Sequence, residues 1–233
     1  MKRITSNFTI GGVIYASLFS AAFAAGLPLG ISTVDTAGLP ENGDEWLTEN
    51  PYRADAAGEE VWLRAIEIGA SGYNQNCARC HGLEVISGGL APDLRLLEAE
   101  EYGDEWYVER FRTGATQNGT TKMPAFGELL GQDAAWAIRT YIETRPDDVV
   151  MADFTDELKG MRDQLAAFGD DASGADPDAL IARLNTIAGE IPTISGAPVA
   201  DSVAYRAAKQ IDGTPAAYKS AAETLTIGLS AAQ

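Results

Sequence analysis

The sequence predicts an all-α fold in two parts, and three observations indicate it. Apolar residues recur every three or four positions over 58–72, 104–112 and 132–144, which is the pattern of helices with one buried face. Similar patterns continue over 147–233 in an Ala-rich composition. No strand-rich region interrupts them. We therefore expect a helical domain over 58–146 and a C-terminal helical extension.

The first residues have the pattern of a secretory signal peptide. Lys2 and Arg3 precede an apolar stretch over about 10–25, and Ala22-Phe23-Ala24 resembles a cleavage site. We expect a signal peptide over 1–24 and export of the mature protein. An uncleaved membrane anchor is the alternative, because the apolar stretch is close to the length of about 17 residues that spans a bilayer.

The chain is strongly acidic. It contains 17 Lys and Arg against 34 Asp and Glu, a formal net charge of −17. Loss of Lys2 and Arg3 with the signal peptide changes the charge from −17 to −19. Such a protein does not bind nucleic acid through phosphate contacts. The charge favours positive patches on partners, and simple solubility is the alternative interpretation.

Residues 25–57 carry little periodicity, and we expect an extended acidic arm there. Trp46 and Tyr52 are isolated aromatic residues within it. Free linkers seldom hold such rings. We therefore expect the arm to pack both rings against the domain that follows, rather than to serve as a free linker.

The helix over 58–72 has a small residue where another helix can approach. Gly69, Tyr73 and Cys77 are each four positions apart, so they lie on one face of the helix. We expect Ile138 and Tyr141 of the third helix to pack there. The second helix is expected to start at Gly103 or Asp104 and to end before Thr113-Gly114.

Residues Cys77-Ala78-Arg79-Cys80-His81 form the motif C-x-x-C-H, the attachment sequence of a c-type haem. Two thiols three positions apart can each add to a vinyl group of one porphyrin, and the next residue places an imidazole under the iron. The chain has only two Cys and one His, and all three lie in this motif. We therefore expect one haem c, held by Cys77 and Cys80, with His81 as its proximal ligand.

Other interpretations of these cysteines are weaker. A structural zinc site needs four nitrogen or sulfur ligands, and the chain offers three. A thioredoxin-like motif belongs near a βαβ pattern. A disulfide between cysteines three apart has poor geometry.

Met123 is the strongest candidate for the sixth iron ligand. It follows a polar loop over 117–122 and precedes Pro124, which holds the backbone extended. The rivals are Met151, after the third helix, and Met161, on an apolar helical stripe where Met ordinarily packs in a core. A loop carbonyl at Pro92 is expected to accept the Nδ1–H of His81. Apolar residues expected to exclude water from the haem are Leu90, Leu94 and Phe126.

The extension is expected to contain four helices without a chemical motif. Their boundaries are indicated by Asp153 with a stripe to Phe168, by Asp176-Pro177 and Gly189, by the range 201–211 with Gly213, and by Thr214-Pro215. The extension is either a docking module or an appendage that stabilises the fold.

Four segments together resemble a known family. They are Gly69 to Gly82 with the haem motif, Ala91-Pro92-Asp93-Leu94, Met123-Pro124-Ala125-Phe126, and Trp136 to Ile142. Over about 58–145 they resemble the class I cytochromes c. The resemblance implies a helical fold around one haem, with His81 and Met123 as axial ligands.

A narrower resemblance involves Asn50-Pro51-Tyr52-Arg53, the run from Glu67 to Glu84, and Asp104-Glu105-Trp106. These segments are similar to the PedF-type cytochromes c, which accept electrons from periplasmic quinoprotein alcohol dehydrogenases that carry pyrroloquinoline quinone. The extension has no counterpart in that family, which leaves the partner and the assembly state open.

We expect a periplasmic one-electron carrier rather than an enzyme, with a quinoprotein alcohol dehydrogenase as donor. A downstream cytochrome or terminal oxidase would be the acceptor. Three alternatives remain. They are a haem peroxidase or sensor with a labile sixth ligand, a fixed haem subunit of a membrane complex anchored by an uncleaved leader, and an interaction protein that acts mainly through 147–233.

Overall fold

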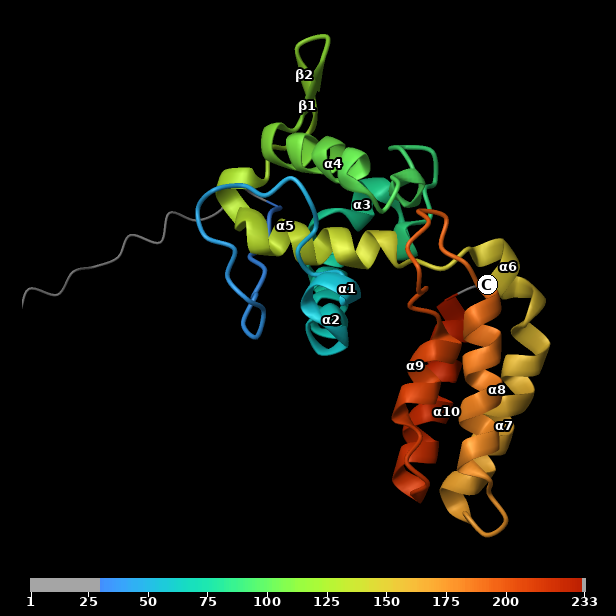
Figure 1. The fold of residues 1–233 in the computed structure, drawn as a ribbon. Helices are drawn as coiled ribbons and strands as arrows, with labels where there is room; N and C mark the ends of the chain where they lie inside the picture. The colour runs from blue at the N-terminus through green and yellow to red at the C-terminus, as the bar shows by residue number, and fades with distance from the viewer. Residues whose placement is uncertain (1–29, 232–233) are drawn as a thin grey trace, which may run out of the picture.

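The computed structural model describes residues 30–231 (Figure 1), so the signal peptide predicted over 1–24 lies outside the described residues. The elements are α1 (Ala54–Ala57), α2 (Glu59–Asn76), α3 (Ala78–His81), 3-10 turns at Leu83–Val85 and Leu94–Leu96, α4 (Glu101–Thr113), β1 (Ala115–Gln117), β2 (Thr120–Met123), α5 (Gly127–Glu143), α6 (Asp148–Asp153), α7 (Thr155–Asp170), α8 (Pro177–Glu190), α9 (Val203–Gln210) and α10 (Pro215–Ala231). The predicted all-α class is confirmed. Among these helices, none has the length and apolar character needed to cross a membrane.

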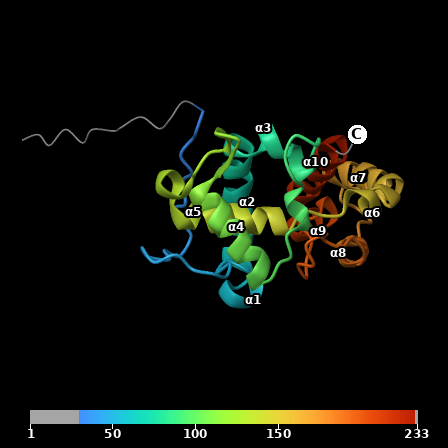
Figure 2. The same cartoon turned by 90° about the horizontal axis from the view of Figure 1, so that it is seen from above.

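Two separate apolar cores divide the described residues. The arm and the elements from α1 to α5, here called the N-terminal module, surround a core rich in aromatic side chains. The elements from α6 to α10, here called the extension, surround a core of Leu, Ile and Ala. Figure 2 shows the two groups of helices side by side. The predicted boundary between 146 and 147 stays a prediction.

The crossing of α2 and α5 is the centre of the N-terminal module (Figure 1). A Cβ added to Gly69 would collide with the carbonyl oxygen of Ala137, so only glycine allows this approach. The rings of Tyr73 and Tyr141 lie 5.4 Å apart, centroid to centroid. The predicted contact of Tyr141 with the Gly69–Tyr73 face is confirmed.

Helix α4 differs from its prediction in where it starts and in what Asp104 does. It begins at Glu101, and Asp104 is fully buried rather than at the helix start. The Asp104 carboxylate accepts from Nε of Arg139 at 2.8 Å and pairs with Arg53 at 2.8 Å. A buried carboxylate needs such partners, and they come from the arm and α5, far along the chain.

The polar loop predicted over 117–122 is wrong, because strands β1 and β2 form a two-stranded antiparallel hairpin there. Its turn is Asn118-Gly119, with φ of 53° and 72°. Asn-Gly is the preferred pair for a turn with two positive φ angles. The turn residues were visible in the sequence, but the short polar strands carry no apolar alternation.

Helix α5 also starts earlier than predicted. Its first turn begins at Gly127, and Gly131 interrupts the helix at φ 77°. The predicted helix over 132–144 therefore matches the part after this kink.

The arm packs as the sequence predicts. Tyr52 is buried and donates from its hydroxyl to the carbonyl of Pro40 at 2.7 Å. The Trp46 ring lies 6.4 Å from that of Phe111 in α4. The arm therefore covers the N-terminal module rather than hanging free.

The four predicted helices of the extension are confirmed as α7 to α10. Asp176 accepts from the backbone N–H of Ala179 at 3.0 Å, with Pro177 in the first turn, as the sequence indicated. Ser202 caps α9 in the same manner. The short helix α6, capped by Asp147, was not predicted.

Polar contacts join the two regions along a seam. Lys209 pairs with Glu59 at 2.5 Å, and the ring of Tyr205 meets Trp62 edge-on at 5.8 Å. The buried Arg145 pairs with Asp201. The extension therefore contacts the N-terminal module at the start of α2 and just after the end of α5.

Candidate haem-binding site

The motif cysteines lie on one helical turn. Cys77 ends α2 and begins α3, and its carbonyl accepts from the N–H groups of Cys80 and His81 at 3.0 Å each. Both thiols are free and partly exposed. Burial, and secondly the neighbouring Cys80, raise the pKa of the Cys77 thiol to about 12, because its sulfur faces apolar core. The two thiols therefore lie on one helical turn at the edge of the N-terminal core.

The imidazole of His81 is oriented by a backbone carbonyl. Its Nδ1 lies 3.0 Å from the carbonyl oxygen of Pro92, as the sequence predicted. When Nδ1–H donates to that oxygen, Nε2 carries the lone pair and is available to a metal. The loop that presents Pro92 is held by Ser87, whose hydroxyl donates to the carbonyl of Ala91.

Gly82 follows the motif directly, and no other amino acid fits at this position. Gly82 has φ 88°, and a Cβ there would collide with the carbonyl oxygen of Ile86. Its own carbonyl accepts from the hydroxyl of Tyr73 at 2.8 Å. This bond ties the residue after His81 to α2, which fixes the direction in which His81 leaves the turn.

Met123 is the methionine that shares a core with the motif. It ends β2 and packs, partly buried, against the same apolar cluster as Cys77. Met161 is buried in the core of the extension, and Met151 packs against that second core. The site residues remain predictions, but this partition favours Met123 over its rivals.

The three apolar residues expected to shield the haem differ in their exposure to solvent. Phe126 is buried, and Leu94 packs partly buried against the N-terminal core. Leu90 instead is 77% exposed, because it lies in the Gly-rich loop that Ser87 closes on itself. Its role in excluding water from the site stays a prediction.

One buried donor in the N-terminal core has no acceptor. Among the described residues, Nε1 of Trp136 is the single buried side-chain nitrogen or oxygen without a hydrogen-bond partner. The Trp136 ring packs 6.5 Å from Tyr107 in the same core as Cys77. An unmet buried donor is costly, and an acceptor on a group bound within this core would satisfy it. The residues present therefore fit a haem at this site.

A zinc site receives no support from the structure. Across residues 30–231, no three side chains of His, Cys, Asp or Glu gather in a way that would hold a metal ion. The ligand set of the motif thus lacks the further protein ligands that structural zinc requires.

Sequence reasoning missed a buried ionic cluster that joins the arm, α4 and α5. Arg139, Asp104 and Glu143 are all buried, and Arg53 donates to Glu143 at 2.8 Å. Burial raises the pKa of Glu143, and the attraction of Arg139 opposes that shift. No pattern in the sequence marked these residues as partners, since they are 35 or more positions apart except for Arg139 and Glu143 on one helix.

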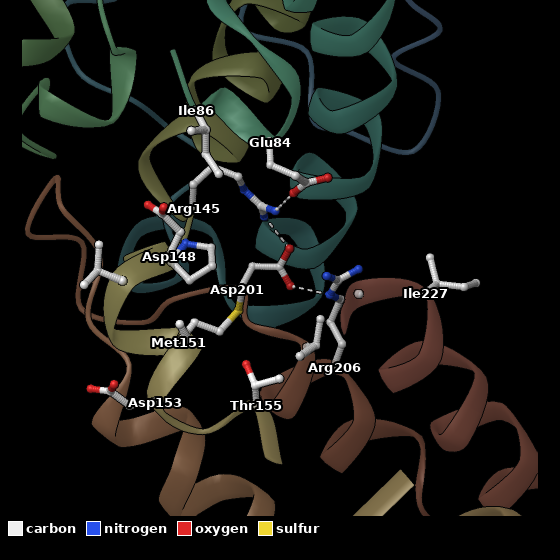
Figure 3. A pocket seen from close by; sticks show the side chains of 15 residues that line it. Glu84, Ile86, Arg145, Asp148, Met151, Asp153, Thr155, Asp201, Arg206 and Ile227 are labelled. Carbon is white, nitrogen blue, oxygen red and sulfur yellow. Dashed lines mark hydrogen bonds and ion pairs between the residues drawn. The ribbon is translucent and has the colours of Figure 1, made fainter. Parts of the chain in front are cut away.

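A cleft of about 690 Å³ lies at the seam (Figure 3). Asp201 pairs with both Arg145 and Arg206 at this cleft, and Met151 also lines it. Neither cysteine of the motif lines the cleft. The cleft therefore belongs to the junction of the two regions rather than to the haem-binding site.

Comparisons with known proteins cover the N-terminal module. Residues 64–142 match the family described as cytochrome c oxidase, cbb3-type, subunit III. The chain is 52% identical over 128 residues to cytochrome c550 of Pseudomonas aeruginosa, a match that spans 55% of this chain and 86% of that protein. It is 34% identical over 79 residues to cytochrome c6 of Euglena gracilis, with 33% of this chain and 88% of that protein covered.

A third relative is much larger than the matched segment. The chain is 32% identical over 85 residues to the quinohemoprotein alcohol dehydrogenase ADH-IIG of Pseudomonas putida, which is 36% of this chain and 11% of that protein. No solved structure matches the chain.

Proposed function

This chain belongs to the cytochrome c family, and from this premise we propose that it is a periplasmic carrier that accepts electrons from a quinoprotein alcohol dehydrogenase. The protein is a c-type cytochrome that transfers electrons and carries one covalently bound haem c. The compartment, the partners and the residues at the haem are the proposed part.

In this proposal Cys77 and Cys80 would attach the haem, and His81 and Met123 would bind its iron. The observation that carries the assignment is the contact of His81 Nδ1 with the Pro92 carbonyl, 3.0 Å away. A surface histidine has no need of that contact, whereas a metal-bound imidazole is typically held by one. Met123 is supported by its place in the same core as Cys77.

Haem c, when bound, supplies one-electron exchange between Fe(III) and Fe(II). The protein's part would be to hold the His81 imidazole and the Met123 thioether in place. Pro92 fixes the His81 ring, and the hairpin delivers Met123 at the end of β2. Two protein ligands leave no position open to oxygen or peroxide, and a thioether ligand raises the reduction potential. This ligand set suits a carrier better than a peroxidase or sensor.

Two observations support the alcohol dehydrogenase as donor. The segments similar to PedF-type cytochromes include Asn50 and Asp104, which are buried and bonded to each other at 2.9 Å. In addition, a protein named quinohemoprotein alcohol dehydrogenase contains a segment similar to this chain. A downstream cytochrome or terminal oxidase is the proposed acceptor.

A fixed haem subunit of a membrane complex is the second candidate. The description of the matching family, which names a subunit of a cbb3-type oxidase, favours it. That role needs an uncleaved leader, so the intact mass of the exported protein distinguishes the two. An intact mass equal to that of a chain cleaved after Ala24 supports the free carrier. An intact mass that includes the leader supports the anchored subunit.

Stopped-flow reduction of the oxidised protein by a purified quinoprotein alcohol dehydrogenase tests the carrier function. The experiment uses the full mature chain at low and high salt. Fast reduction whose rate depends on salt is the expected result, since charged surfaces guide such encounters. Slow reduction without salt dependence would leave the cytochrome standing and remove this donor.

Replacing Met123 tests the sixth ligand. We predict that Met123→Ala keeps the covalent haem, loses the Met-to-iron absorption band, lowers the reduction potential and opens the iron to carbon monoxide. Visible spectra with and without carbon monoxide measure this. Met151→Ala and Met161→Ala are the matched controls and should keep the spectrum of the unaltered protein. An unchanged spectrum for Met123→Ala would show that another group binds the iron.

A further inference from the structure

The cleft at the seam has the dimensions of a small-molecule site. Its volume of about 690 Å³ lies within the range of about 300–1,000 Å³ that is typical of ligand pockets. A second hollow of about 210 Å³ shares four of its lining residues. These shared residues are Glu84, Arg145, Asp201 and Arg206, which lie together in Figure 3. The two hollows therefore meet at one set of charged side chains.

Apolar side chains from both regions form walls of the cleft. Ile86 belongs to the N-terminal module, whereas Val149 and Met151 come from α6 and Ile227 comes from α10 of the extension. Val149 is 73% exposed and Ile227 is 63% exposed, although both are large aliphatic residues. Exposed apolar surface around a hollow is typical of a place where an apolar group of a ligand becomes buried. The cleft is therefore suited to a molecule with an aliphatic part.

The two arginines of the cleft differ in the hydrogen bonds that they already make. Arg145 is fully engaged, because its Nε donates to the carbonyl of Tyr141 at 3.0 Å and its two Nη groups donate to Glu84 and Asp201. The acidic oxygen nearest to Arg206 is Oδ1 of Asp201, 3.3 Å from Nε. Within residues 30–231 the Arg206 guanidinium donates no hydrogen bond, and 44% of its side chain is exposed. Its two Nη groups are therefore free to bind a ligand.

Close packing of α9 on α10 places this guanidinium beside an apolar wall. A Cβ added to Gly228 in α10 would collide with the side chain of Val203 in α9, so the two helices are in direct contact here. Both residues line the cleft. Figure 3 shows Arg206 and Ile227 on these adjacent helices, at the same side of the cleft. A cationic donor and an aliphatic surface are thus available to one ligand.

The acids of the cleft limit the charge that a ligand can carry. Asp148 is paired with Arg95, which does not line the cleft. Asp153 also lines the cleft and forms no ion pair with any described residue. A second negative charge on a ligand would be repelled by Asp153. The net charge of the chain opposes anions as well, but interactions beyond about 8 Å are largely screened at physiological salt, so the nearby Arg206 decides.

We propose that the seam cleft binds a small aliphatic monocarboxylate. Its carboxylate accepts hydrogen bonds from the Nη groups of Arg206, a pairing that is charge-assisted and geometrically matched. Its chain lies against the walls that Val149 and Ile227 form. Since the cleft is lined from both regions, the extension would serve as a ligand-binding module rather than as a passive appendage. This inference goes beyond the proposed electron transfer and does not depend on the iron ligands.

Titration calorimetry of the full, haem-loaded chain with octanoate tests the site, and octan-1-ol and octylamine are the matched probes. We expect octanoate to bind saturably and both matched probes to bind about tenfold more weakly or less, because they lack the charge-assisted hydrogen bonds. Each methylene removed from octanoate should weaken binding by up to about fourfold. Absence of octanoate binding would overturn the proposal. Octanol or octylamine binding as tightly as octanoate would overturn the carboxylate assignment.

Two variants locate the site within the protein. Arg206→Gln should weaken octanoate binding about tenfold, and Ile227→Ser about fourfold, the effect of about one buried methylene group. Arg183→Gln is the matched control, because this arginine pairs with Glu157 on the surface of the extension and does not line the cleft. Its affinity for octanoate should stay within about twofold of the unaltered protein. Equal affinities of Arg206→Gln and Arg183→Gln would overturn the proposal, and unchanged helical circular dichroism verifies that each variant is folded.

Discussion

The N-terminal module and the extension are both helical, but their helices are held in different ways. In the extension, α6, α8 and α9 each begin after a capping residue whose side chain accepts a hydrogen bond from a backbone N–H. The capping residues are Asp147, Asp176 and Ser202. In the N-terminal module, α2, α4 and α5 have no such side-chain cap. Local signals therefore start most helices of the extension, whereas contacts between distant residues fix those of the module.

The two cores differ in the same sense. The buried core of the extension consists of Leu, Ile, Val and Ala with Met161 and a single aromatic residue, Tyr218. The module buries Arg139, Asp104 and Glu143 beside its aromatic core and leaves Nε1 of Trp136 without a partner. A buried charge or orphan donor is tolerated only when partners are in place. We therefore expect the module to depend on its haem and its long-range ion pairs, and the extension to stay folded without them.

The largest expected effect comes from preventing haem attachment. We predict that the double variant Cys77→Ser, Cys80→Ser loses covalent haem and that amide protection collapses in α2 and α5 but persists in α7 to α10. Hydrogen exchange with mass spectrometry measures each helix. Loss of protection in both regions alike would show that the extension has no stability of its own, and the comparison would fail.

Breaking the buried cluster should come next. Arg139→Met leaves Asp104 and Glu143 buried with fewer cations, and removing one partner of a buried pair costs about 3–5 kcal/mol. Denaturant unfolding of the haem-loaded protein measures the free energy. Arg183→Met in the extension is the control, because its pair with Glu157 is on the surface and should contribute little. A similar loss in both variants would contradict the comparison.

A smaller effect is expected at a helix start in the extension. Asp176→Ala removes the acceptor for the N–H of Ala179, which should cost about 1 kcal/mol. The thermal unfolding of the extension should shift, while the visible spectrum of the haem stays as it was. A change in that spectrum would mean that the extension positions the site, which the separate cores argue against.

The smallest effect concerns the seam and depends on pH. Hydrogen bonds from Lys209 and then Tyr205 lower the pKa of the exposed Glu59 carboxyl below its ordinary value. A lowered pKa means that the stabilisation is present above that value and is lost as the pH falls through the pKa of the folded protein. The Glu59→Gln variant should therefore have a slightly lower melting temperature than the unaltered protein at pH 6. The two melting temperatures should converge toward pH 3, and a constant difference would rule out this pair as the cause.

Much of the site followed from residues that are close in the sequence. The haem motif, the glycine at position 69 and the carbonyl of Pro92 were each identified by spacing, and the structure contains the predicted contacts of His81 and of Gly69. The cap at Asp176 and the proline that follows it were also identified from the sequence. Local geometry determines these features, because a helical turn or a short loop brings the same neighbours together in any fold that preserves it.

The features that only the tertiary structure decided connect distant parts of the chain. Asp104 was expected at a helix start, yet it is buried because Arg53 and Arg139 reach it from 51 and 35 positions away. The loop that carries Leu90 is closed by the bond from the Ser87 hydroxyl to the Ala91 carbonyl, which no pattern in the sequence indicated. Ion pairing is a matter of position in space, and the sequence supplies the charges without their partners.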